Sequence, residues 1–149
     1  MIKILFIGCF CMSLCLFAQG AVVLAMIRGI HYWKKRHELG TSFLEKYLVL
    51  LVSMACMLFC IFFQAGIWAA LFMCLDEFTS WSTAFYYSLV NFATLGYGDI
   101  VMSDDWRILG AIEAVNGVMM LGMTTSMLYA VFNHLIIDPM THAHQGENQ

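Results

Sequence analysis

The stretch 94–99, with the sequence TLGYGD, holds the residues whose spacing suggests the most specific chemistry. Successive carbonyl oxygens of an extended strand point to opposite sides, but a glycine adopts positive φ at little steric cost. Because Gly96 and Gly98 stand at alternate positions, the backbone can turn its carbonyl oxygens toward one side. Such a row of oxygens, with the hydroxyl of Thr94, would replace the water that a potassium ion sheds in a narrow pore.

A short helix is expected directly before this stretch. Residues 81–95 are mostly aromatic and aliphatic, and Thr79, Ser80 and Ser82 are candidates for the N-cap. The segment is too short to cross a bilayer and is followed at once by glycines, which is typical of a re-entrant segment. Its C-terminal end carries partial negative charge and would favour a cation in the pore.

Three longer apolar stretches, residues 4–27, 47–75 and 108–137, are each long enough to cross a membrane. About 20 helical residues span the roughly 30 Å hydrocarbon layer. The chain is 62% hydrophobic and 11% charged, whereas soluble domains carry about 25% charged residues. We therefore expect an all-α membrane protein with three transmembrane helices, a re-entrant pore helix and an ion-coordinating loop.

The distribution of charge predicts the orientation. The segment between the first two apolar stretches carries five of the seven Lys and Arg residues, namely Arg28, Lys34, Lys35, Arg36 and Lys46. The segment between the second and third stretches is acidic instead. Because basic segments favour the cytoplasmic side, we expect a multi-pass protein of the cell membrane. Its N-terminus and re-entrant loop would lie outside, and its C-terminus in the cytoplasm.

The first apolar stretch has an alternative interpretation as a cleaved signal peptide. Lys3, the apolar run and the residues Ala18, Gln19 and Gly20 fit the three parts of such a peptide. The apolar run continues to Ile27, however, and cleavage would reverse the orientation of every later segment. We favour an uncleaved first helix.

The expected organisation is an N-terminal transmembrane helix with a basic connection in residues 1–46, a pore module in residues 47–137 and a short cytoplasmic tail in residues 138–149. The six cysteines lie in or beside apolar stretches, without the paired spacing of disulfides or metal sites. The sequence has no Gly-rich phosphate loop and no nucleophile–histidine arrangement. We therefore expect no enzyme, no cofactor other than potassium ions, and no nucleic-acid partner.

Residues 47–134 resemble the two-helix pore module of the potassium channel family. The resemblance rests on TLGYGD at the end of an aromatic-rich short helix, on Trp106 and Arg107 after it, and on a following helix with a mid-span glycine. It implies a homotetramer in membrane lipid, in which each chain supplies a quarter of the selectivity filter. It also implies that potassium ions bind in the filter segment, formed by Thr94, Leu95, Gly96, Tyr97 and Gly98.

The resemblance further implies roles for residues around the filter. Asp99 would lie behind the outer mouth with a hydrogen bond to Tyr86, and Gly117 stands near the gating hinge of the inner helix. The pore-facing side of that helix would carry Val118, Leu121, Thr125 and Tyr129. Asn91 would support the filter, but Asn91 and Ala93 stand where the family often has hydroxyl residues. The hydrogen bonds that brace the loop must therefore differ.

Several assignments stay open. Glu113 either raises the local cation concentration or is hydrogen-bonded against the pore helix. Asn116 either faces a water-filled cavity or bonds across helices, while Gly110 and Gly122 are expected to serve close helix packing. The alternative function is a non-conducting or regulatory membrane subunit with a channel-like fold. The sequence does not indicate the gating stimulus, and an unknown regulatory subunit stays open as a partner.

Overall fold

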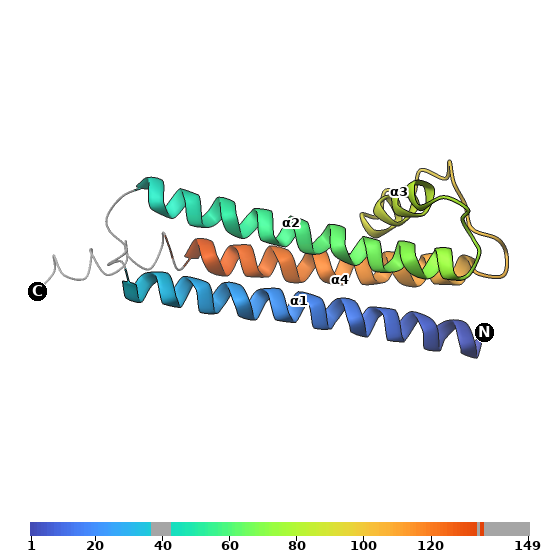
Figure 1. The fold of residues 1–149 in the computed structure, drawn as a ribbon, viewed down its shortest axis with the longest axis horizontal. Coiled ribbons are helices and arrows are strands. Elements are labelled where there is room, and N and C mark those ends of the chain that lie inside the picture. Colours follow the sequence, from blue (N-terminus) through green and yellow to red (C-terminus); the bar gives the residue numbers. More distant parts are fainter. Residues whose placement is uncertain (37–42, 134, 136–149) are drawn as a thin grey trace, which may run out of the picture.

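The computed structural model describes residues 1–36, 43–133 and 135. In these residues the chain forms a bundle of long helices with a short helix at one end (Figure 1). The helices are α1 (Ile2–Arg36), α2 (Phe43–Cys74), α3 (Trp81–Phe92) and α4 (Arg107–Phe132). The predicted all-α fold, with three long helices and one short helix before the TLGYGD stretch, is confirmed.

Three of the described helices are long and apolar enough to cross a membrane, so the chain is a multi-pass membrane protein. Their apolar segments are Ile2–Tyr32, Phe43–Cys74 and Arg107–Phe132. The first helix is longer than the predicted stretch 4–27, because α1 continues without a break into the basic segment. Its 35 residues, rising about 1.5 Å each, exceed the thickness of the hydrocarbon layer.

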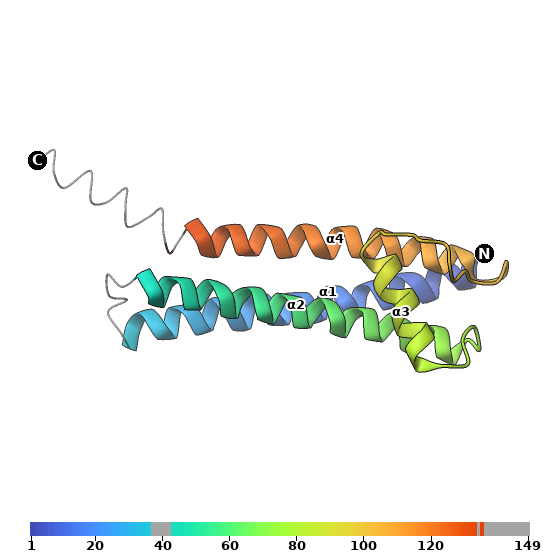
Figure 2. The same ribbon diagram turned by 90° about the horizontal axis from the view of Figure 1, so that it is seen from above.

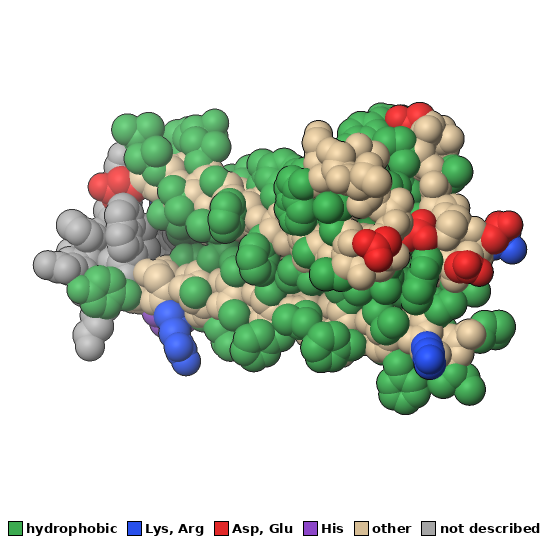
Figure 3. All heavy atoms as spheres, turned by 45° about the vertical axis from the view of Figure 1, so that its right-hand side comes forward, with side chains coloured by type: hydrophobic (Ala, Val, Ile, Leu, Met, Phe, Trp, Pro, Cys, Tyr) green, Lys and Arg blue, Asp and Glu red, His purple; other side chains and the backbone are tan. Residues whose placement is uncertain are grey.

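The two ends of the bundle differ in charge and in structure. The N-terminus lies at the same end as α3, and the last residues of α1 and the first residues of α2 lie at the other (Figures 1 and 2). Acidic side chains gather at the α3 end, while apolar side chains cover the flank (Figure 3). The acidic segment and the basic segment therefore lie at opposite ends, as the charge pattern predicts. Which end faces the cytoplasm stays a prediction.

An aromatic cluster holds α3 against the bundle. Trp68 and Phe72 of α2 are fully buried, and so is Phe92 at the end of α3. The ring of Tyr87 packs edge-on against Phe72 with the ring centroids 5.6 Å apart, and in a tilted arrangement against Phe78 with the centroids 5.2 Å apart. Aromatic pairs in such geometry add to the stabilisation from burial alone. The short helix is thus fixed before the loop begins.

The turn after α2 also holds the segment that follows TLGYGD. Asp76 adopts φ of 59°, and its N–H donates to the carbonyl of Met73 while Glu77 N–H donates to Phe72. This bonding pattern closes a helix C-terminus. The Glu77 carboxylate then accepts hydrogen bonds from the backbone N–H and the hydroxyl of Ser103. The segment that follows TLGYGD is therefore tied to the turn that precedes α3.

Parts of the predicted organisation lie outside the described residues. They are the tail, residues 138–149, and residues 37–42 of the basic connection. The predicted domain boundaries at residues 46 and 137 stay predictions.

Candidate functional site

The backbone of the loop after α3 alternates between left-handed and ordinary torsions. Thr94, Gly96 and Gly98 have φ of 61°, 55° and 73°. Leu95 and Tyr97, which stand between them, keep the usual negative φ. The positive φ expected at the two glycines is therefore observed. In such an alternation successive peptide planes turn the same way, so that their carbonyls need not point to opposite sides as in a strand.

The positive φ of Thr94 was not expected from the sequence and has a local cause. Leu95 N–H donates to the carbonyl of Val90 at 2.9 Å, and Thr94 N–H donates to Asn91 at 2.9 Å. This pair of bonds closes α3 with a left-handed residue, a place that glycine usually takes. A residue with a Cβ costs about 1 kcal/mol there. The end of the helix and the first turn of the loop are thus one structure.

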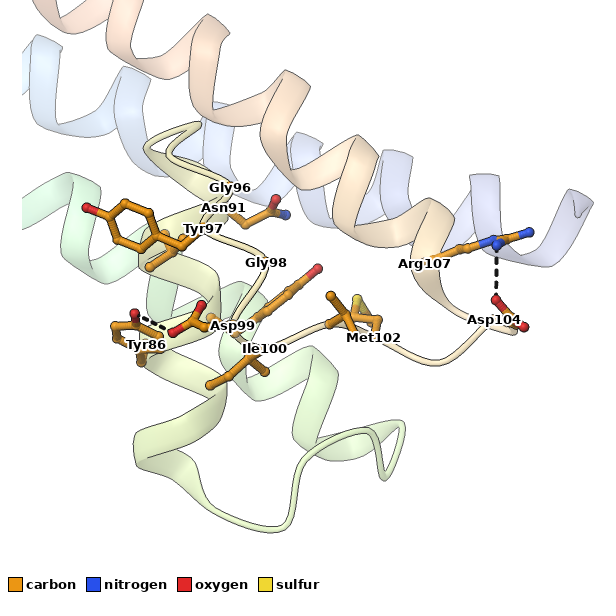
Figure 4. Close-up of a pocket in the computed structure, with 13 residues that line it drawn as sticks. Tyr86, Asn91, Gly96, Tyr97, Gly98, Asp99, Ile100, Met102, Asp104 and Arg107 are labelled. Carbon is orange, nitrogen blue, oxygen red and sulfur yellow. Dashed lines mark hydrogen bonds and ion pairs between the residues drawn. The ribbon is translucent and has the colours of Figure 1, made fainter.

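The loop is little covered by its own chain. Leu95 is 55% exposed and Tyr97 is 65% exposed. A hollow of about 440 Å³ separates part of the loop from α3 and the start of α4, and Tyr97, Gly98 and Asp99 line it (Figure 4). The ion-binding residues predicted here, 94–98, are therefore brought together on one loop that is open on one side.

Tyr86 and Asp99 join the short helix to the end of the loop. The Tyr86 hydroxyl donates to the Asp99 carboxylate at 2.8 Å, across the space between α3 and the loop (Figure 4). This hydrogen bond raises the pKa of Tyr86 above its ordinary value, since it stabilises the protonated phenol. The contact is the one that the family resemblance implied.

Asn91 supports the helix rather than the loop itself. Its side-chain amide donates to the carboxylate of Glu113 at 2.9 Å and to the backbone carbonyl of Gly110. Glu113 is fully buried, so the bond braces the end of α3 against α4. Of the two interpretations of Glu113, the hydrogen bond against the pore helix agrees with this geometry.

Asn116 is also fully buried, between α4 and its neighbours. It lies beside Cys15 of α1, and its amide makes no regular hydrogen bond with the described residues. Within one chain Asn116 is buried between helices, but the predicted hydrogen bond across helices is not found among the described residues.

The glycines of α4 differ in what surrounds them. A Cβ on Gly117 would overlap the backbone carbonyl oxygen of Phe92, and one on Gly110 would overlap the hydroxyl of Tyr87. A Cβ on Gly122 would meet none of the described atoms within 4 Å. Close packing therefore holds for Gly110, as expected, but not for Gly122 within the described chain, and it also holds for Gly117. The proposed hinge at Gly117 stays a prediction.

The predicted pore-facing residues lie on the side of α4 that the chain leaves uncovered. Val118 is 58% exposed and Tyr129 is 64% exposed. Thr125 is exposed, with its hydroxyl bonded to the carbonyl of Leu121 on its own helix, and Leu121 is half-buried. The opposite face of α4 carries the buried residues of the helix, including Glu113. A single chain does not form a pore, so it stays a prediction that these four residues face water in one.

Two further residues were missed by sequence reasoning. Glu77, which ties the segment after the loop to the turn before α3, is one of several acids in its segment and has no distinguishing pattern. Gln19 was considered only as part of a cleavage site, although a polar side chain in an apolar stretch is a signal for an interhelical contact.

The comparison with known proteins agrees with this arrangement of helices and loop. A protein-family model described as ion channel matches residues 48–134, which is more than half of the chain. The matched residues begin in α2 and extend just past α4, so that α1 lies outside the match. No solved structure matches the chain.

Proposed function

The chain belongs to the ion channel family, and from this premise we propose that it is one subunit of a potassium-selective channel. Potassium ions would pass along the loop 94–98 and bind its carbonyl oxygens, with the Thr94 hydroxyl at the inner mouth. The carbonyls replace the hydration shell of the ion, so that conduction needs no reaction and no further cofactor. The short helix α3 favours the cation by directing its partially negative C-terminal end toward the loop.

The observation that supports selectivity is the alternation of torsions in the loop. Left-handed φ at Thr94, Gly96 and Gly98 allows consecutive carbonyls to share one direction. The first of these torsions is fixed by the end of α3, so the loop has a defined start. A defined backbone is what a site for a dehydrated ion requires, because the spacing of the oxygens must match the ion.

The proposal includes a homotetramer in lipid. One chain supplies one loop, and a ring of carbonyls around an axis needs closed rotational symmetry. The exposed side chains of Leu95, Tyr97 and Val118 lie on the part of the chain that such a symmetry would cover. A fourfold ring would give the loop and the open face of α4 their missing neighbours.

The proposed orientation places the α3 end of the bundle outside the cell. The basic residues of the first connection then lie in the cytoplasm, as the positive-inside tendency requires. Acids such as Asp99 and Asp104 would surround the outer mouth, and their field would raise the local concentration of cations.

Reconstitution in liposomes tests the proposal. The purified protein is expected to run as a tetramer, pass potassium, exclude sodium and be blocked by barium. Gly96→Ala is expected to abolish the flux, since a Cβ there meets no described atom and disturbs only the torsion at φ of 55°. Gly29→Ala is the matched control, because it adds the same methyl to an open site on α1 and should leave the flux intact.

Three results would contradict the proposal in different ways. Equal sodium and potassium flux would reject selectivity and keep the channel. An intact tetramer without flux would favour the non-conducting or regulatory subunit. A stable monomer in lipid would remove the ring on which the carbonyl site depends.

A further inference from the structure

Gln19 is a polar side chain that is fully buried in the middle of α1, among apolar helices. Burying an amide without hydrogen bonds costs about 2–7 kcal/mol. In a membrane helix such a residue commonly marks a contact with another helix. The hydrogen-bond partners of Gln19 therefore show which helices α1 contacts specifically.

The amide of Gln19 is bonded to both helices of the pore module. Its Nε2 donates to the hydroxyl of Thr124 on α4 at 3.0 Å. Its Oε1 accepts from Nε2 of Gln64 on α2 at 2.7 Å and from the thiol of Cys60 at 3.3 Å. One side chain of α1 thus joins α2 to α4.

Thr124 differs from the hydroxyl residues around it. The hydroxyls of Thr125 and Ser126 donate to the carbonyls of Leu121 and Gly122 on their own helix. Thr124 is buried and its hydroxyl instead accepts a bond from another helix. The contact is therefore specific to one position of α4 and is not a general property of its hydroxyl groups.

The position of Thr124 gives the contact a consequence for the pore. It lies about two helical turns beyond Gly117, on the buried face of α4 and away from Val118 and Tyr129. This is the half of α4 that leads away from the loop (Figure 1). Any displacement of that half of α4 must either break the bond to Gln19 or carry α1 along.

We propose that Gln19 is a positioning residue, through which α1 holds the inner helix α4 in its present place and so sets how readily the pore opens. The effect on opening rests on the proposed function, whereas the coupling between the helices does not. It follows that α1 is a working part of the mature subunit, although it lies outside the part matched by the family model.

A double-mutant cycle on the full chain in detergent or nanodiscs tests the coupling without any flux. Gln19→Leu and Thr124→Val each remove one partner, and each is expected to lower the midpoint of thermal unfolding. The double variant should be no less stable than the worse single variant, because both remove the same bond. Thr124→Ser keeps the hydroxyl and should restore the wild-type midpoint. Ser126→Ala, which removes only a bond within α4, is the matched control.

Single-channel recording then separates positioning from general damage. Gln19→Leu and Thr124→Val are expected to change the open probability in the same direction, with the larger change in Gln19→Leu, which also loses the bonds to Gln64 and Cys60. The unitary conductance and the potassium-to-sodium ratio should stay at the wild-type values, since the loop is not touched. The inference would be overturned if the unfolding shifts of the two single variants added up in the double variant. It would also be overturned if mass spectrometry of the purified protein showed that the segment containing Gln19 had been removed. If the wild-type protein passes no ions, the proposed function fails, while the unfolding cycle still decides whether α1 and α4 are coupled.

Discussion

The loop after α3 and the junction of α1, α2 and α4 hold their shapes by opposite means. In the loop, the backbone torsions of Thr94, Gly96 and Gly98 define the shape, and side chains such as Tyr97 remain exposed. At the junction, the backbone is ordinary helix and the side chains of Gln19 and its partners supply the specificity. One region depends on torsions, the other on hydrogen bonds.

The difference shows which part of the assembly a single chain can complete. The junction is buried and bonded within one copy, so it forms when that copy folds. The loop is tied to α3 by the hydrogen bond between Tyr86 and Asp99, while the side chains of Leu95 and Tyr97 remain exposed. In the proposed tetramer, the loop would be completed only by neighbouring copies, whereas the junction of α1, α2 and α4 is complete within one chain.

The largest expected effect would come from Gly117→Ala, which disrupts the contact between α4 and the C-terminal end of α3, just before the loop. The added methyl would overlap the carbonyl oxygen of Phe92, and a backbone group cannot swing aside as a side chain can. We expect a loss of about 3 kcal/mol or failure to fold, measured as thermal unfolding in detergent. Gly122→Ala is the control with open space around it. Equal stability of the two variants would contradict the close approach.

A smaller effect is expected from Glu113→Leu, which removes the buried acceptor that braces α3. The amide of Asn91 would lose one of its partners inside the protein, at a cost of about 1–3 kcal/mol in unfolding free energy. Glu113→Gln keeps an oxygen in place and should cost less. If both variants unfold alike, the brace does not contribute to stability.

Gly98→Ala sharpens the comparison, since it changes a torsion and nothing else. Its φ of 73° lies in the left-handed region, and a Cβ there meets none of the described atoms. We expect a penalty of about 1–2 kcal/mol together with a loss of potassium flux in liposomes. A variant with wild-type flux would show that the loop does not depend on this torsion.

The smallest effect is expected from the exposed bond between Tyr86 and Asp99. Because the bond raises the pKa of Tyr86, its contribution is present below the ordinary tyrosine pKa of about 10 and is lost as pH rises through the raised value. Flux recorded across this alkaline range should change in the wild type. Tyr86→Phe should remove that change and leave potassium conduction at neutral pH. A phenylalanine variant with the same alkaline profile would assign the titration to another group.

Much of the fold follows from the sequence, because helices that cross a membrane are specified by local apolar length. The start of α4 and both ends of the short α3 agree with the predictions to within a few residues. The positive φ of Gly96 and Gly98 follows from their spacing, and the pair of Tyr86 and Asp99 from the family resemblance. All of these features are encoded within a short stretch of chain.

The contacts between helices could not be predicted in the same way. Gln19 is separated by 45 residues from Gln64 and by 105 from Thr124, so that no local pattern links them. The positive φ of Thr94 was also missed, because it depends on where α3 ends. In each case the deciding fact is how one element meets another in space.

The contact between Gly117 and Phe92 has a consequence for the time course of any motion. Phe92 stands two residues before Thr94, and its backbone carbonyl touches the surface of α4 at Gly117 without a side chain between them. In the proposed channel, a bend of α4 at this point would therefore press directly on the backbone that leads into the loop. Opening at the inner helix and rearrangement at the loop would then share a single relaxation rate, and a recording that resolves two independent rates would require a softer joint than this one.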